Sequence, residues 1–575
     1  DSILNAANDV DVLAAAVTGF TVFNDIDDLT VGSVTVLAET PFEMTVAGID
    51  SQDKEVKVQT GGDLLIVEQI DVGSAGIFLM VGGDASQDSS GTILADRLGI
   101  HVAGSMRLDA DNDVHELAAD NGGFTLFNDI DDLVISRVTV AAGTAFEMSA
   151  VGVSTVDQDV KINCGGELLI DDPINSGNGN VLLSVDGPLS QTLVDPDGLD
   201  GTISCAGLGL MVSGPVDLSN PGNQIDRFAA DVAGPVTFTN GSHLELASLT
   251  VDGMTIDCVD VLGDLELTIA GELTQSAAIL VGGNAILDVS GNICLTGASC
   301  DPDALDGNDN DFMGTLNAFA GSSLEIADSN ELTIGNLVAA DQIRLRSGDG
   351  STGGVALNGS ITTTAAGGHV LLQSDLGVYQ DAALSVIDTE NLMLGSSFDS
   401  DARSGDFLLL GNNTVERIAA ELEDGLEFAN RRDLEIAPLD FVSQCGLFTA
   451  EFDGLHVDSL VVNVTAGQAT TGNLTDAANA VTVINRTAAL NVVGDIVLGD
   501  GAASLNFTDH LIDQLLDQNV STAHVSVAAA GNAGNPDGTD ITSAANVSLY
   551  VDSTIILSDV NVSGLLFIDT IEGVS

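Results

Sequence analysis

The sequence predicts an all-β chain folded as a parallel β-helix, a β-solenoid of roughly 25 coils with loop insertions. Strand-like runs of Val, Ile, Leu, Phe and Thr recur about every 8–12 residues, and Gly, Asn, Asp and Ser fill the joints between them. Three such strands make a coil of roughly 20–22 residues, and a super-repeat of about 100 residues runs along the chain. An antiparallel sandwich also has short, regular strands, but it does not predict the super-repeat.

The super-repeat is defined by the stretch Phe20–Val36, which returns at Phe124–Val140 with 12 of 17 positions identical. Fainter copies occur at Val236–Val251 and Leu426–Phe441. Each copy is an alternating apolar run, an Asn-led polar turn and a second alternating run, which predicts a strand, a turn and a strand. The first two copies keep one register until extra residues enter a single turn, as a solenoid permits because loops leave the stack without disturbing it.

These copies divide the chain into four β-helix repeat units: 1–111, 112–222, 223–411 with degenerate coils, and 412–575 with divergent C-terminal coils. The β pattern is interrupted at Thr508–Val520, where apolar residues at helical spacing follow a Thr/Asp cap and predict a short surface helix. The start of the sequence lacks a signal peptide and lies partway into a repeat, so we expect a processed chain or a segment of a longer polypeptide.

The polar composition is strongly acidic, with 86 Asp and Glu against 14 Lys and Arg and a formal net charge of −72. Phosphate binding needs a basic stripe, so we expect no nucleic-acid partner. No apolar run approaches the ~20 residues of a transmembrane helix, so we expect no membrane span. So large a charge repels itself unless salt or divalent cations screen it. We therefore expect an extracellular or cell-surface setting that is saline or contains calcium.

The phrases SQ, GTI, LGI, LDAD, NDV, LAAD, FTLFNDIDDL and VTV follow one another between Ser86 and Val140. This order resembles the haemagglutinin-type repeats of filamentous bacterial exoproteins, which are giant adhesin-like surface proteins. The resemblance implies a right-handed parallel β-helix and an exported, non-enzymatic rod at the cell surface. The amino-terminal secretion domain of such exoproteins and a surface anchor are not recognisable in this sequence, which leaves export and attachment open.

Two acidic patterns are candidate Ca²⁺ sites, because this ion prefers oxygen ligands. The NDIDD turns at Asn24–Asp28 and Asn128–Asp132 become NGSHL and NRRDL in later copies, so we interpret them as turns in which Asn and Asp supply the backbone geometry. The phrase DPD.LDG occurs in two inserted loops, which are either Ca²⁺ sites or plain acidic loops. The candidate ligands in these loops are Asp195, Asp197, Asp200, Asp301, Asp303, Asp306, Asp309 and Asp311.

Cysteines and sequons add candidate modification sites. Cys294 and Cys300 are close enough in sequence to predict a local disulfide, with buried thiols as the alternative. Asn-x-Ser/Thr sequons gather in the last third of the chain, where an exported protein would carry glycans if the organism has the machinery. The candidate glycosylation sites are Asn463, Asn473, Asn485 and Asn506.

The sequence favours an extracellular structural or adhesive β-solenoid rod, a non-catalytic subunit of a surface filament or a stalk segment of a giant surface protein. The expected partners are further copies in end-to-end contact, Ca²⁺, and a carbohydrate or cell-surface ligand. The alternative is a carbohydrate-active β-helix enzyme, a polysaccharide lyase or hydrolase. A sugar cleft normally stacks rings on aromatic faces, and this chain has no Trp and two Tyr, which favours the non-catalytic interpretation.

Overall fold

A computed structural model describes residues 2–193, 200–297, 300, 310–348, 353–396, 405–422, 425–452 and 454–456, and then the strands between residues 459 and 570. The chain divides into two compact units. The N-terminal unit comprises Asp1–Glu272, Ser276–Gly283 and Cys300–Ala304. The C-terminal unit comprises Leu273–Gln275, Asn284–Ser299 and Leu305–Ser575.

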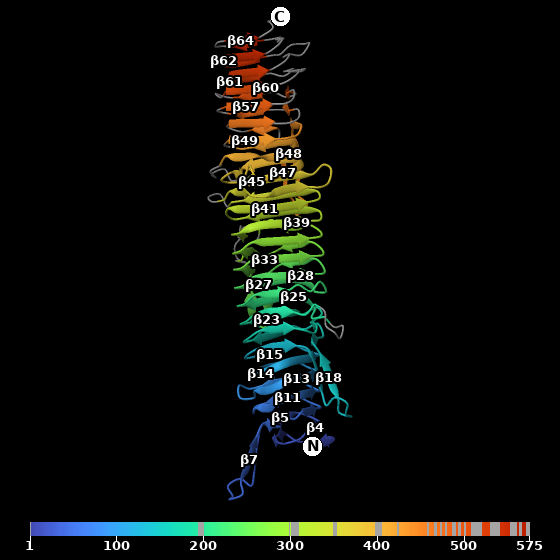
Figure 1. Cartoon of the computed structure of the whole chain (residues 1–575). Coiled ribbons are helices and arrows are strands. Elements are labelled where there is room, and N and C mark those ends of the chain that lie inside the picture. The colour runs from blue at the N-terminus through green and yellow to red at the C-terminus, as the bar shows by residue number, and fades with distance from the viewer. Residues whose placement is uncertain are drawn as a thin grey trace. The chain divides into compact units, whose positions relative to one another are not determined.

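Both units are all-β in their described residues, and each is a parallel β-helix, which confirms the predicted fold class (Figure 1). The helix predicted at Thr508–Val520 falls outside the described residues except for Val520, where a strand begins. A helix with the length and apolar character needed to cross a membrane is not found in the part of the chain that the structure describes.

Parallel ladders stack the coils of the N-terminal unit. The first ladder joins β1 (Ser2–Asn8), β4 (Thr21–Asp25), β9 (Val56–Thr60), β11 (Ile70–Val81), β13 (Ile93–Val102) and β14 (Met106–Asn121), and then divides into β16 (Leu133–Ile135) and β19 (Val153–Thr155). The second joins β2 (Val12–Leu13), β5 (Leu29–Val31), β10 (Leu64–Ile66), β12 (Ala85–Gln87), β14, β15 (Thr125–Asp129), β20 (Val160–Cys164), β23 (Asn180–Val185), β25 (Ile203–Val212) and β27 (Gln224–Val232). The remaining coil strands are β3 (Ala15–Ala16), β8 (Ile49–Asp50), β21 (Leu168–Ile170), β22 (Ile174–Asn175), β24 (Leu189–Gln191), β26 (Val216–Leu218), β28 (Val236–Asn240), β29 (Leu244–Leu246), β32 (Val259–Val261), β33 (Leu265–Ile269) and β35 (Ile279–Val281).

The C-terminal unit is built in the same way. One ladder joins β36 (Ala285–Val289), β39 (Thr315–Ala320), β41 (Leu332–Ala339), β43 (Val355–Leu357), β46 (Val378–Gln380), β48 (Phe407–Glu421), β49 (Gly425–Asn430), β54 (Ser459–Val464), β57 (Ala480–Asn485), β60 (Ala502–Phe507), β61 (Val520–Ala529), β62 (Ile541–Val551) and β64 (Leu566–Thr570). Another joins β34 (Leu273–Gln275), β37 (Ile293–Leu295), β40 (Ser323–Asp328), β42 (Gln342–Ser347), β45 (His369–Ser374), β47 (Val386–Ser396) and β48. The other coil strands are β38 (Asp311–Phe312), β44 (Ser360–Thr363), β50 (Leu434–Ile436), β53 (Leu455–His456), β55 (Ala469–Thr471), β56 (Leu474–Ala477), β58 (Leu490–Val492), β59 (Ile496–Leu498) and β63 (Val560–Val562).

Strand β14 shows why these sequences form coils. Its first half alternates strictly, so that Leu108, Ala110 and Val114 are buried inside the coil while Asp109 and Asp113 face solvent. Successive side chains of a strand point to opposite faces, and a coil closed on itself has an apolar interior and a polar exterior. The alternation therefore buries apolar side chains and places the charges outside.

Side chains at the turns cap the backbone of the next coil. Asp63 Oδ1 accepts a hydrogen bond from the Asp84 N–H (2.8 Å), and Asp84 Oδ1 accepts one from the Ser105 N–H (2.7 Å). Both contacts join residues 21 apart, which confirms the predicted coil length. In the C-terminal unit asparagine takes the same role, since Asn317 Oδ1 accepts a hydrogen bond from the Asn336 N–H (2.9 Å).

At recurring points along the ladders, the pairing register of two stacked strands shifts, and the first residue that pairs after the shift is an asparagine. The shifts lie between Leu108 and Asn112 and between Leu409 and Asn413. Both asparagines are fully buried. Asn112 Nδ2 donates to the Leu108 carbonyl (3.3 Å), and its Oδ1 accepts a hydrogen bond from the Ile93 N–H (2.9 Å). The side chain thus satisfies backbone groups that the shift leaves without a ladder partner.

A glutamine from an earlier coil completes this arrangement. Gln87 Nε2 donates to Asn112 Oδ1 at 2.7 Å, and Asn112 Nδ2 donates back to Gln87 Oε1 at 3.2 Å. The same reciprocal amide pair recurs along the chain. The other pairs, with the distance from Gln Nε2 to Asn Oδ1, are Gln191–Asn223 (2.9 Å), Gln275–Asn310 (2.9 Å) and Gln380–Asn413 (2.7 Å).

Replacing Asn223 with Ala should lower the free energy of unfolding by about 2–4 kcal/mol. The change removes the acceptor of the buried Ile203 N–H, which donates to Asn223 Oδ1 at 2.8 Å, and the partner of the half-buried Gln191 amide. The exposed Asn178→Ala variant is the control and should change stability by less than about 0.5 kcal/mol. Urea denaturation followed by circular dichroism measures both, and equal midpoints for the two variants would contradict the assigned role.

Candidate functional site

In the part of the chain that the structure describes, four antiparallel hairpins branch outward from the coils. The sequence predicted that the second run of each copy is one strand, and this was wrong, because the chain leaves the coil after three residues and enters a hairpin. In the first copy β5 belongs to the coil and Ser33–Val36 to the hairpin. The hairpins are β6 (Ser33–Val36) with β7 (Met44–Ala47), β17 (Arg137–Val140) with β18 (Met148–Val151), β30 (Leu249–Val251) with β31 (Met254–Ile256), and β51 (Leu439–Val442) with β52 (Thr449–Phe452).

The hairpin β17–β18 lies on the outer face of earlier coils. Val138 and Val140 are fully buried against Phe78 and Ala118, which point outward from coils that precede the hairpin in the chain. Near the hairpin tip, the Phe146 ring lies 6.1 Å from that of Phe20, at the start of the previous repeat copy. The hairpin therefore points toward the N-terminus and spans about one repeat unit.

The hairpin β30–β31 docks in the same way in the next repeat unit of the sequence. Leu249 and Val251 pack against Leu182 and Ala229. At the tip, the Asp252 carboxylate forms an ion pair with Arg107 (3.0 Å), which also lies over the Phe124 ring at 5.2 Å. This ion pair lowers the pKa of Asp252 below its usual range.

Glycines on the coil make room for both hairpins. A Cβ atom at Gly99 would lie 2.5 Å from the Phe78 ring and 3.2 Å from Val138. A Cβ atom at Gly209 would lie 2.9 Å from Leu249 and 3.1 Å from Leu182. Each of these glycines follows a leucine of the repeat, in Leu98-Gly99 and Leu208-Gly209, and its lack of a side chain lets a hairpin approach the sheet closely.

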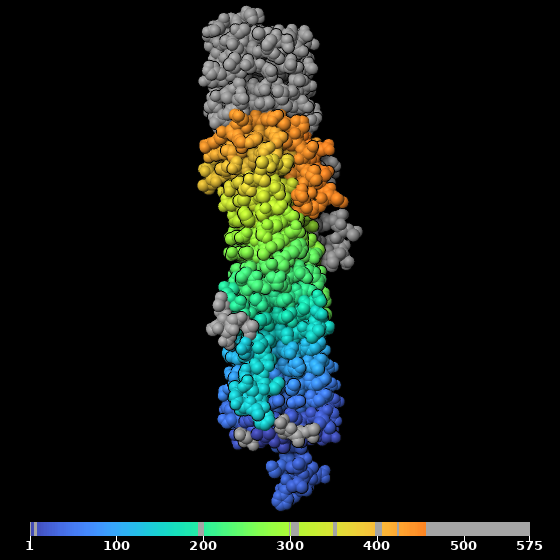
Figure 2. Space-filling model, turned by 90° about the vertical axis from the view of Figure 1, so that its right-hand side faces the viewer, coloured from blue at the N-terminus to red at the C-terminus, as the bar shows by residue number. Residues whose placement is uncertain are grey.

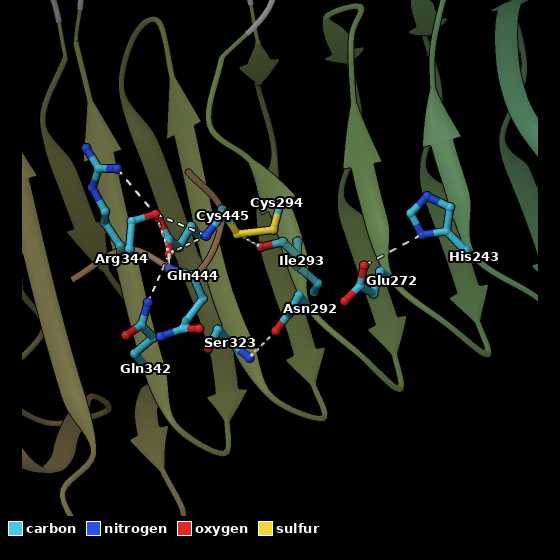
Figure 3. Close-up of a disulfide and its surroundings, with 12 residues drawn as sticks. His243, Glu272, Asn292, Ile293, Cys294, Ser323, Gln342, Arg344, Gln444 and Cys445 are labelled. Carbon is cyan, nitrogen blue, oxygen red and sulfur yellow. Dashed lines mark hydrogen bonds and ion pairs between the residues drawn. A yellow bond between two sulfur atoms is a disulfide. The ribbon is translucent and has the colours of Figure 1, made fainter. Parts of the chain in front are cut away.

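In the C-terminal unit a disulfide fastens the hairpin β51–β52. The bond joins Cys294 on β37 to Cys445 in the hairpin loop (Figure 3). The predicted Cys294–Cys300 disulfide is therefore wrong, and the side chain of Cys300 contacts Cys258 instead. The correct partner lies 151 residues away in sequence, and the coil stack brings it beside Cys294.

A buried carboxylate lies next to this disulfide. Glu325 on β40 is fully buried and accepts hydrogen bonds from Ser443 Oγ (2.7 Å) and the Gln444 N–H (2.7 Å) in the hairpin loop. The Arg344 guanidinium lies 3.6 Å from the carboxylate and 3.5 Å above the Phe448 ring. Figure 3 shows Arg344 and Gln444 close to the disulfide. A buried charge needs this many partners, so Glu325 fixes the loop in one position.

The acidic loops lie mostly outside the described residues. Of the predicted calcium ligands, the structure describes only Asp200, which is half-buried, and Asp311, at the start of β38. Among the described residues, no group of three or more His, Cys, Asp or Glu side chains is placed to hold a metal ion. Calcium binding by the loops stays a prediction. The ligands outside the described residues are Asp195, Asp197, Asp301, Asp303, Asp306 and Asp309.

The NDIDD turns are corners of the coil. Asp129 is buried, and its carboxylate accepts hydrogen bonds from the Val114 N–H (2.9 Å) and the Asp131 N–H (3.2 Å). Burial raises the pKa of Asp129 to about 8. Asn240 occupies the same corner in the next repeat unit, and its Oδ1 accepts a hydrogen bond from the Ile225 N–H (3.0 Å). The carboxylate that the sequence offered to a metal binds backbone groups instead.

A cavity of about 480 Å³ lies beside β18 and is lined by Met80, His101, Asp120 and Met148, among others. His101 Nδ1 lies 3.1 Å from Asp120 Oδ2, and Ser154 Oγ donates to Asp120 Oδ1 at 2.9 Å. In a Ser-His-Asp triad the hydroxyl contacts the histidine, whereas Ser154 Oγ contacts the carboxylate of Asp120. The three side chains connect β13, β14 and β19 of successive coils.

Three of the four predicted glycosylation sites lie on strands of the C-terminal unit. Asn463, Asn485 and Asn506 belong to β54, β57 and β60, whereas Asn473 lies outside the described residues.

Comparisons with protein-family models, with curated proteins and with solved structures found no match to this chain. The resemblance to haemagglutinin-type repeats therefore stays a prediction from the sequence.

Removing the disulfide should destabilise the hairpin β51–β52. Cys445→Ser should lower the free energy of unfolding by about 3 kcal/mol, because the bond closes a long loop. Reductant should destabilise the parent chain to the same extent and the variant no further. Mass spectrometry of peptides under non-reducing conditions checks the pairing, and a peptide linking Cys294 to Cys300 would contradict it.

Stability should fall as pH rises from about 4 to about 8. The Asp129 carboxyl ionises at its ordinary value of 3.8 when unfolded but at about 8 when folded, so the folded chain binds more protons in this window. Asp129→Asn should therefore flatten the fall and stabilise the chain by about 2 kcal/mol or more at pH 8. Asn240→Asp is the matched reverse variant and should steepen it. Thermal melts across this range test both, and parallel profiles for the three chains would refute the assignment.

Proposed function

We propose that this chain is an extracellular structural or adhesive β-solenoid rod, either a subunit of a surface filament or a stalk segment of a giant surface protein. It acts without catalysis, associates end to end, and uses Ca²⁺ or salt to screen its charge. Its outer face is the surface offered to a carbohydrate or cell-surface ligand.

The observation that carries this proposal is the use of the repeated polar residues. The amide pairs Gln87–Asn112 and Gln191–Asn223 and the corner residues Asp129 and Asn240 bind backbone groups inside the coil. Function is argued from sites rather than from folds, and these recurring side chains are committed to holding the coil together. A chain whose repeated motifs maintain length and stiffness suits a structural role.

The charge supports a cation-dependent assembly. With 86 acidic and 14 basic residues, two copies repel each other strongly in dilute salt. Divalent cations between carboxylates lower this repulsion, and the acidic loops at residues 195–200 and 301–311 are the candidate places.

Negative-stain electron microscopy and thermal melts with Ca²⁺, with high salt and with a chelator test this function. We expect filaments in Ca²⁺ or high salt, and chelation at low salt should shorten them and lower the melting temperature. If chelation changes neither the filament length nor the melting temperature, the proposed role of calcium is contradicted. Cleavage of acidic polysaccharides that is lost on replacing one carboxylate would instead establish the enzyme alternative.

A further inference from the structure

Two thiols of the N-terminal unit lie against each other. Besides the disulfide-bonded Cys294 and Cys445, the chain has four cysteines, and all four are thiols in the structure. Cys258 and Cys300 are half-buried, and a hydrogen bond joins their side chains. Two sulfur atoms in such contact need only a small approach to form a bond, so the pair is a candidate second disulfide.

The other two thiols lie in a different environment. Cys164 on β20 is 3% exposed and Cys205 on β25 is 4% exposed. Cys164 Sγ donates a hydrogen bond to the Asp131 carbonyl at 3.1 Å. A thiol enclosed in a coil strand is shielded from an oxidant, so these two cysteines serve as internal controls for the pair.

The fold places Cys258 and Cys300 together although they are distant in sequence. Cys258 lies between the hairpin β30–β31 and the coil strand β32, and its carbonyl accepts a hydrogen bond from the Ala230 N–H at 3.1 Å. Cys300 belongs to the N-terminal unit together with Cys258, whereas Cys294 belongs to the C-terminal unit. The coil ladder thus holds the backbone at Cys258, and Cys300 lies with it.

The existing disulfide has a similar relation to a hairpin. Cys445 lies in the loop of the hairpin β51–β52, which Figure 2 shows in orange on the side of the C-terminal coils, and the bond ties it to β37. Cys258 follows the end of the hairpin β30–β31 in the same way as a tie at its base. The sequence that begins at Cys300 is the acidic insertion CDPDALDGNDND.

We propose that Cys258 and Cys300 form a second disulfide in the extracellular chain, which holds the start of the acidic insertion against the base of the hairpin β30–β31. This inference rests on the extracellular setting of the proposed function, because disulfides persist where thiols are not kept reduced. The bond closes the chain between residues 258 and 300, which restricts the unfolded state and so stabilises the folded one.

The oxidant is a small-molecule disulfide such as oxidised glutathione. The thiolate of one cysteine attacks it, forms a mixed disulfide and releases one glutathione; the second thiolate then attacks the protein sulfur and releases the other. The two protein thiols lose two electrons and two protons, and oxidised glutathione becomes two molecules of glutathione. Burial, and after it the hydrogen bond with Cys300, raises the pKa of Cys258, so the exchange is best run at mildly alkaline pH.

Thiol counting in the full chain tests the pair. After equilibration with reduced and oxidised glutathione, the chain is denatured and alkylated, and two of its four thiols should be lost, which leaves Cys164 and Cys205. Chymotrypsin cleaves after Leu295 and so separates Cys294 from Cys300. Mass spectrometry without reductant should then show a peptide that links Cys258 to Cys300. Before this treatment reductant acts on the Cys294–Cys445 bond alone, and after it on both bonds.

The variant Cys258→Ser is diagnostic for the pair. Cys300 then has no second thiol to complete the exchange, so the reaction should stop at the mixed disulfide and the chain should gain the mass of one glutathione. The matched control is Cys205→Ser, which removes a buried thiol. It should form the complete link, carry no glutathione and keep one thiol, Cys164.

The outcomes separate the pair from the function on which it rests. A parent chain that keeps four thiols in oxidised glutathione overturns the second disulfide and leaves the proposed rod intact, because filament formation is measured separately. A peptide that links Cys258 to Cys445 overturns it as well. A chain isolated from its source with all six cysteines reduced, which then forms both bonds in glutathione, supports the pair and overturns the extracellular setting.

Discussion

A closed coil must satisfy every backbone group that its ladders leave unpaired, and the register step is where this constraint is most severe. At that step one strand stacks on a bulged strand, so carbonyl and N–H groups face the interior without ladder partners. The amide of Asn112, held by Gln87, satisfies them at full burial. An unsatisfied group there costs as much as a large core substitution. The pair recurs at Gln191–Asn223, Gln275–Asn310 and Gln380–Asn413, so the same solution is used along the stack.

The hairpins follow from the same geometry. Where the first ladder divides, β16 and β19 both stack on β14, and the chain between them has no place inside the coil. It leaves as the hairpin β17–β18 and buries its apolar face on the outside of earlier coils. Gly99 permits this contact because any side chain would strike Phe78. The hairpin and the outer face of the coil thus form a second apolar cluster outside the coil, which connects one repeat unit to the previous one.

Local patterns were sufficient to predict the strands, the coil length and the corner at Asp129, because each depends on alternation or on a turn a few residues long. The hairpins were missed because the residues of β17 alternate exactly as a coil strand does and only their pairing direction differs. The partner of Cys294 was missed because Cys445 comes close only after the coils have stacked. The amide pair had no constant signature in the sequence, because the phrases SQ and ND at Gln87–Asn112 become YQ and NT at Gln380–Asn413.

The acidity of this chain is separate from the demands of its fold. Asp63 and Asp84 cap the backbone of the next coil in the N-terminal unit, but Asn317 caps it equally well in the C-terminal unit. At the corner, Asn240 replaces Asp129 and avoids the cost of burying a charge. Since asparagine caps the same kind of N–H group, the preference for aspartate at the exposed caps adds charge without adding a cap. That preference would suit the extracellular setting proposed above, in which salt or divalent cations would screen a net charge of −72.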